Sequence, residues 1–140
     1  MTRNYYDYKT GLGNVGSYQA SGRPFLSSSI HISSSNDVVR VTFPTVSRFV
    51  TIKNEGPAAS DEVQIRVGFS QNGVNAVENT NYLLLDNQES FSADYRVTDV
   101  YIRVHPTGET TNATASVIAG LTSIDNGELP HNWTGSAGVG

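Results

Sequence analysis

Strict alternation of apolar and polar residues is the feature of this chain that most restricts its fold. In residues 62–69, EVQIRVGF, apolar side chains occupy every second position, and polar residues or glycine occupy the others. Because successive side chains of a β-strand point to opposite faces, this pattern predicts a strand with an apolar face on a core and a polar face toward solvent. We expect the rest of the chain to be organised around this strand.

Seven further segments carry strand signals, and turn formers separate them. They are residues 30–32, 38–43, 46–54, 82–85, 90–95, 100–104 and 113–121. No segment has a helical period, so about eight short strands predict an all-β fold, an antiparallel two-sheet sandwich. Both a jelly roll and an immunoglobulin-like sandwich fit this count. The cysteine and tryptophan landmarks of immunoglobulin domains are absent from the predicted strands, which favours a jelly-roll-like arrangement.

The two ends of the chain differ from the strand-rich middle. Residues 1–27 interleave tyrosines at 5, 6, 8 and 18 with glycines and keep no period, so we expect an extended N-terminal arm there. Residues 28–122 are expected to form the sandwich, and residues 123–140 a Gly-rich C-terminal tail that holds the only tryptophan, Trp133. Glycine leaves a backbone pliable while tyrosine carries a large buriable surface. Such an arm could order against its own domain or on another subunit.

Composition narrows the classes of partner. A chain of 140 residues fits one domain with its own core. The net charge of −4 and the scattered Lys and Arg residues predict no nucleic acid partner. No apolar run is long enough for a membrane helix, and the N-terminal residues lack the apolar run of a signal peptide, so we expect no membrane partner and synthesis in the cytoplasm. The chain has no cysteine, which excludes disulfides.

Histidines and carboxylates give no strong signal for a metal site or a catalytic site. His31, His105 and His131 are far apart in sequence, so a metal site is not expected. Four acidic residues lie closer together in sequence and could form a catalytic acid pair or bind calcium. They are better explained as solvated carboxylates at strand ends and in loops. These acids are Asp86, Glu89, Asp94 and Asp99.

Two glycine-containing segments resemble motifs without their context. Residues 68–72, GFSQN, lack the second glycine of a nucleophile elbow and are expected to follow a strand without leading into a helix. Residues 11–16, GLGNVG, have the spacing of a dinucleotide fingerprint, but neither a strand before them nor a helix after them is predicted. We therefore expect no enzyme activity and no cofactor.

Several stretches together resemble a known class of proteins. They are NYYDYKTGLGNVGSY at residues 4–18, YLLL at 82–85, SF at 90–91 and DVYI at 99–102. In outline they resemble small virion structural proteins of tailed bacteriophages. This resemblance implies a capsid cement or decoration protein, located in the virion and made in the host cytoplasm, with no catalytic residues. Its implied partners are the major capsid protein or other virion proteins and further copies of itself, for instance in a trimer.

In this reading, aromatic side chains in the terminal segments act as protein-interface anchors, since aromatic residues are enriched at interfaces. The candidates are Tyr5, Tyr6, Tyr8, Tyr18, Phe25 and Trp133.

A carbohydrate-binding β-sandwich, free or on a phage fibre, is the alternative. Tyr101 is expected to point away from the core, and Trp133 lies in the tail. Exposed aromatic rings stack on sugars as well as on proteins. Tyr101 could equally fill a cross-strand pair.

Overall fold

Strands from the first half of the chain pair with strands from the second half, and together they form a sandwich of two sheets. In the computed structural model, which describes residues 22–33, 37–56, 63–75, 81–106 and 112–128, the first strand pairs with the last and each inner strand with its counterpart. The antiparallel pairs are β1 (Arg23–Ile32) with β8 (Ala113–Leu121), β2 (Val39–Thr42) with β7 (Asp99–Val104), β3 (Ser47–Asn54) with β6 (Ser90–Ala93), and β4 (Ile65–Gly68) with β5 (Leu83–Leu85).

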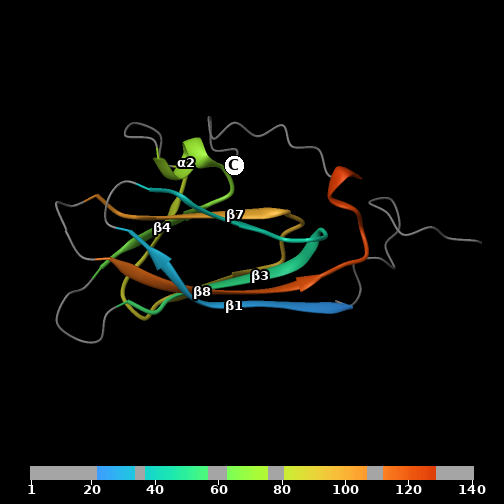
Figure 1. Cartoon of the computed structure of the whole chain (residues 1–140), viewed down its shortest axis with the longest axis horizontal. Coiled ribbons are helices and arrows are strands. Elements are labelled where there is room, and N and C mark those ends of the chain that lie inside the picture. The colour runs from blue at the N-terminus through green and yellow to red at the C-terminus, as the bar shows by residue number, and fades with distance from the viewer. Residues whose placement is uncertain (1–21, 34–36, 57–62, 76–80, 107–111, 129–140) are drawn as a thin grey trace, which may run out of the picture.

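Two further pairings join these hairpins into sheets. β3 also pairs with β8, and β4 also pairs with β7. The first sheet has the order β1-β8-β3-β6 and the second the order β2-β7-β4-β5, four strands each. Figure 1 shows them as two facing layers. This nested order of eight strands is that of a jelly roll, so the predicted all-β, two-sheet fold is confirmed.

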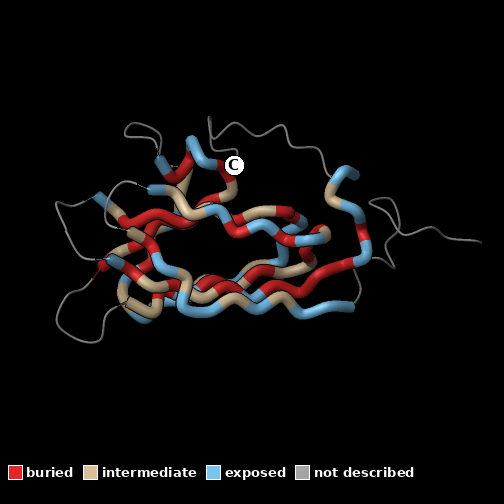
Figure 2. Tube along the Cα trace, in the orientation of Figure 1, coloured by how far each residue is buried: buried red, intermediate tan, exposed pale blue. Residues whose placement is uncertain are grey.

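The core lies between the sheets, and the alternation of β8 fills one side of it. Inward residues at every second position of β8 are at most 2% exposed: Ala113, Ala115, Val117, Ala119 and Leu121. Small side chains leave room for the aromatic rings opposite. Phe25 of β1, paired with Ala119, meets Phe43 edge-on at 5.0 Å between ring centroids. Figure 2 shows buried positions along the strands of both layers.

Asn54, the last residue of β3, ties the two sheets together from within the core. Its side chain is fully buried, and its amide nitrogen donates to the carbonyl oxygens of Val63 at 2.7 Å and Leu85 at 3.2 Å, next to and within the second sheet. Its side-chain oxygen accepts from the Gly56 backbone N–H at 3.0 Å. A buried amide with all these partners satisfies groups that would otherwise be desolvated without compensation.

The sandwich is longer at both ends than the sequence indicated. β1 begins at Arg23, so residues 23–27 belong to the first sheet rather than to the arm. At the other end, Ile124 is fully buried and its carbonyl oxygen accepts from the Val46 N–H at 3.0 Å, so the chain is still packed on the sandwich beyond residue 122. The short 3-10 helix η1 (Asn126–Glu128) follows. Residues 1–21 and 129–140 lie outside the described residues.

The strand that dominated the sequence pattern is shorter than expected and is buried on both faces. Val63, Ile65 and Val67 point into the core as predicted, but Arg66 and Gly68 are buried as well. The expectation of a solvent-facing polar side is therefore wrong. A short helix, α2 (Gln71–Asn75), covers this outer side of β4 (Figure 1).

The local chemistry explains why α2 forms there. Ser70 is an N-cap: its hydroxyl accepts from the Gly73 N–H at 3.0 Å, which satisfies one of the donors left free at a helix start. Gly68 allows the helix to approach, since a Cβ at this position would come within 2.8 Å of the Val74 side chain. The expectation that residues 68–72 do not lead into a helix is thus wrong, and Ser70 has a structural partner.

Candidate functional site

The aromatic residues predicted as interface anchors fall mostly in the terminal segments. Tyr5, Tyr6, Tyr8, Tyr18 and Trp133 lie outside the described residues. Phe25 is half-buried and packs against the core through Phe43. Part of its surface therefore serves the sandwich, and its role at an interface stays a prediction.

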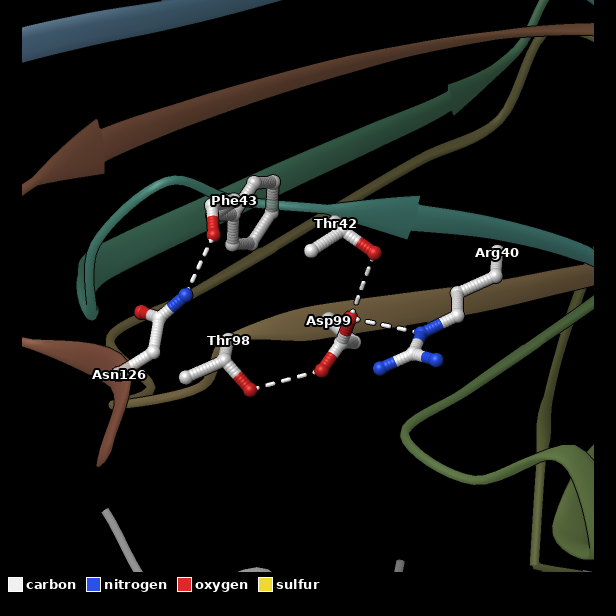
Figure 3. A network of polar contacts seen from close by, with 6 residues as sticks. All are labelled: Arg40, Thr42, Phe43, Thr98, Asp99 and Asn126. Atoms are coloured by element: carbon white, nitrogen blue, oxygen red, sulfur yellow. Dashed lines mark hydrogen bonds and ion pairs between the residues drawn. The ribbon is translucent and has the colours of Figure 1, made fainter. Parts of the chain in front are cut away.

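The edge of the second sheet carries a compact polar network (Figure 3). Asp99 accepts from Arg40 Nε at 2.9 Å and from the Thr42 hydroxyl at 2.8 Å on one oxygen. Its other oxygen accepts from the Thr98 hydroxyl at 2.7 Å. Burial alone would raise the pKa of Asp99, but these hydrogen bonds and the charge of Arg40 together lower it. Both oxygens are engaged, so this carboxylate stabilises the junction of β2 and β7.

Tyr101 lies beside this network on the outer side of β7. It is half-exposed, and the Arg40 guanidinium carbon lies 5.7 Å from its ring centroid. Arg40 and Tyr101 are also directly paired across β2 and β7. A cation over an aromatic face is an attractive contact, so the cross-strand pair expected as one reading of Tyr101 is present.

Two arginines sit directly opposite each other on the outer side of the same sheet. Arg66 of β4 pairs with Arg103 of β7, and each is only 6% exposed. Both guanidinium groups donate hydrogen bonds to oxygen atoms at the end of α2. Arg66 Nη1 donates to the Val74 carbonyl at 3.1 Å. Arg103 Nη1 donates to the Asn75 carbonyl at 3.1 Å and to the Asn75 side-chain oxygen at 2.7 Å. Cationic side chains suit the last carbonyls of a helix, so the arginines pin α2 onto the sheet.

His105 and Tyr82 complete this cluster. Arg66 Nε donates to His105 Nδ1 at 3.0 Å, and the Arg66 guanidinium carbon lies 4.2 Å from the Tyr82 ring centroid. Burial, followed by the charges of Arg66 and Arg103, lowers the pKa of His105. Burial and the neighbouring Arg66 likewise lower the pKa of Arg103. The neutral imidazole is thus held as a hydrogen-bond acceptor.

The other residues considered for chemistry are separated or have structural roles. His31 is exposed on β1, and His131 lies outside the described residues. Asp86 accepts from the Gln64 side chain, and the Glu89 carboxylate accepts from the Asp86 N–H at 2.9 Å, which closes a turn. Asp94 is exposed. Within the described residues there is no group of three or more potential metal ligands, and no helix long and apolar enough to cross a membrane.

The outer side of the first sheet is chemically different. Leu26, Ile118, Thr51 and Ser92 form one row across its four strands, and Pro24, Gly120 and Phe49 form the next row. Leu26 is 69% exposed and Ile118 is 42% exposed. We call the outward apolar residues Pro24, Leu26, Phe49 and Ile118 the apolar face; Thr51 and exposed Lys53 follow on the same side of β3. The sequence identified Ile118 as outward-pointing, but it missed the face because residues up to 27 were assigned to the arm.

No protein-family model and no curated protein matches this chain.

Proposed function

We propose that this protein is a non-enzymatic virion structural protein that binds and stabilises a phage capsid, with its terminal segments making contacts to neighbouring subunits. The jelly roll is the observation that carries the proposal. This architecture is common in viral capsid domains, and it provides a rigid body from whose ends segments can extend.

The use of polar side chains in the described residues supports the same reading. Asp99 is surrounded by hydrogen-bond donors, Ser70 caps α2, and Arg66 and Arg103 hold that helix on the sheet. These groups stabilise the sandwich, which leaves outer surfaces and terminal segments as the parts available to partners. The tyrosine content of residues 1–21 suits such contacts, because tyrosine buries a large area at modest cost in side-chain entropy.

Removal of residues 2–20 tests the proposal. The shortened chain keeps Gly22, whose N–H donates to the Leu121 carbonyl at 3.0 Å, and all of β1, so the sandwich should stay folded. We expect it to lose co-sedimentation with tail-free capsids of the virus that encodes it, while the full chain sediments with them. A full-length variant with serine in place of Tyr5, Tyr6, Tyr8 and Tyr18 separates the aromatic side chains from chain length. Equal binding by the full and shortened chains would refute the role of the arm, and failure of the full chain to bind would refute the capsid function.

Carbohydrate binding is the alternative, and the half-exposed ring of Tyr101 is the observation in its favour. Jelly rolls also occur in lectin domains. Arg40, however, lies over the ring and competes with stacking of a sugar. A glycan array separates the two functions: a specific signal that is lost in the Tyr101→Ala or Trp133→Ala variant supports sugar recognition, and the absence of any signal counts against it.

A further inference from the structure

We infer that protonation of His105 detaches the end of α2 from the second sheet, so that this fold carries a conformational switch operated by mild acid. The switch consists of His105, Arg66, Arg103 and the end of α2. It belongs to the sandwich itself and operates with or without capsid binding. Its basis is a set of contacts that only a neutral imidazole allows.

The contact between Arg66 and His105 requires an unprotonated ring nitrogen. Arg66 Nε donates to His105 Nδ1 at 3.0 Å. A guanidinium group has N–H donors and no acceptor, so this hydrogen bond needs the lone pair on Nδ1. When both ring nitrogens carry protons, two donors and two positive charges face each other, and the contact is lost.

The groups around His105 oppose a positive charge on its ring. Arg66 of β4 and Arg103 of β7 act on it through their charges, and the Tyr82 ring centroid lies 6.3 Å from that of the imidazole. The five residues of α2 include no titratable side chain. Burial, followed by the two arginine charges, lowers the pKa of His105 from its ordinary value of 6.5. Protons therefore bind more readily to an arrangement in which these contacts are broken, and acid shifts the population toward it.

The main chain at His105 is held in place, so side chains must respond to the proton. The His105 N–H donates to the Gln64 carbonyl at 2.9 Å. The Gln64 side chain in turn donates to the Asp86 carboxylate, so this neighbouring acid already has a partner. Whether the charged ring turns outward or Arg66 withdraws, the Nε–H of an arginine that is only 6% exposed loses its acceptor.

The planar guanidinium group of Arg66 transmits this loss to α2. Its Nη1 donates to the Val74 carbonyl at 3.1 Å, and its carbon lies 4.2 Å from the Tyr82 ring centroid. Nε and Nη1 belong to one rigid group, so a movement that separates Nε from His105 also shifts Nη1 away from α2. A helix of five residues has little stability of its own and depends on such tertiary contacts.

A thiol at position 74 measures the opening of α2. The Val74 side chain is fully buried and packs against Gly68 of β4. Because the chain has no cysteine, the Val74→Cys variant carries a single thiol beneath α2. The rate at which a pyridyl disulfide modifies this thiol reports how often α2 lifts from the sheet. Gly127→Cys, at an exposed position in η1, gives the rate for an accessible thiol at each pH.

The labelling rate of Val74→Cys relative to Gly127→Cys should rise about tenfold from pH 7.5 to pH 5, as expected for the loss of one hydrogen bond to a charged group. Addition of His105→Gln, which keeps an acceptor for Arg66 and does not titrate, should abolish the rise. The matched control is His31→Gln, which replaces an exposed histidine of β1 and should leave the rise unchanged.

A thiol in the core separates the opening of α2 from unfolding of the whole domain. Val117 of β8 is fully buried, and Val117→Cys should react slowly at both pH values. All variants should keep the far-ultraviolet circular dichroism of the native fold at pH 7.5. The inference is overturned if the relative rate of Val74→Cys is the same at both pH values, if its rise persists with His105→Gln, or if Val117→Cys becomes reactive in parallel.

Discussion

Replacement of Asn54 should weaken the sandwich more than replacement of any single polar residue near its surface. The Asn54→Ala variant leaves the Val63 and Leu85 carbonyl oxygens and the Gly56 N–H without their side-chain partner. At about 1 kcal/mol for each lost hydrogen bond, the free energy of unfolding should fall by about 3 kcal/mol. For a domain of this size that corresponds to a Tm lowered by about 10 °C.

Asn126→Ala is the matched control. The Asn126 amide makes one hydrogen bond, to the Phe43 carbonyl at 2.8 Å, and the residue is only half-buried. Its replacement should cost about 1 kcal/mol. Thermal unfolding followed by circular dichroism, at a fixed and low protein concentration, compares the two variants.

An Asn54→Asp variant adds a pH signature to the same test. A carboxylate there would face the carbonyl oxygens of Val63 and Leu85 in a fully buried position, so its pKa should rise on folding. A group with a raised pKa in the folded state favours the protonated form, so this variant should regain stability as the pH is lowered from 7.5 to 5. The Asn54→Ala variant should not. If Asn54→Ala costs no more than Asn126→Ala, the idea that Asn54 ties the sheets together is wrong.

Two further predictions concern the outer side of the second sheet. Burial and the neighbouring arginines lower the pKa of His105 from its ordinary value of 6.5, so its contribution to stability is complete above pH 6.5 and decreases as the pH falls below that value. Urea midpoints measured from pH 8 to 5 should show this loss of stability. The His105→Gln variant, whose side chain can still accept from Arg66, should show a smaller loss. Gly68→Ala should lower the free energy of unfolding by about 1–3 kcal/mol, because its methyl group would collide with Val74, whereas Gly127→Ala, with nothing within 4 Å, should change it by less than about 0.5 kcal/mol in the same urea titrations.

The sequence predicted the parts of the fold in which one face of a strand is buried and the other is exposed. β8 alternates from Ala113 to Ala119, and its inward residues could be assigned from the pattern alone. The start of β1 could not, because Pro24 and the irregularity near Ser29 interrupt the period of two. The pattern also says nothing about what covers the outside of a sheet. For this reason the alternating pattern predicted that Arg66 would be exposed to solvent.

The candidate surfaces were predicted less well than the fold. The cluster of Arg66, Arg103 and His105 depends on a register between strands that are distant in sequence. The only local sign was a cationic residue at an outward position of each strand. The helix that covers the two arginines has five residues, too few to produce a helical period. Phe25, predicted as an interface residue, meets Phe43 because the nested strand order brings β1 and the end of β2 together.

The location and copy number of this chain in virus particles test the proposed function most directly. Particles purified from the cells that carry its gene can be analysed by quantitative mass spectrometry and by cryo-electron microscopy. We expect the chain to be present in a fixed ratio to the major capsid protein, with density for a jelly roll on the outer surface of the shell. Particles that lack the chain, or that carry it only on tail fibres, would contradict the capsid function.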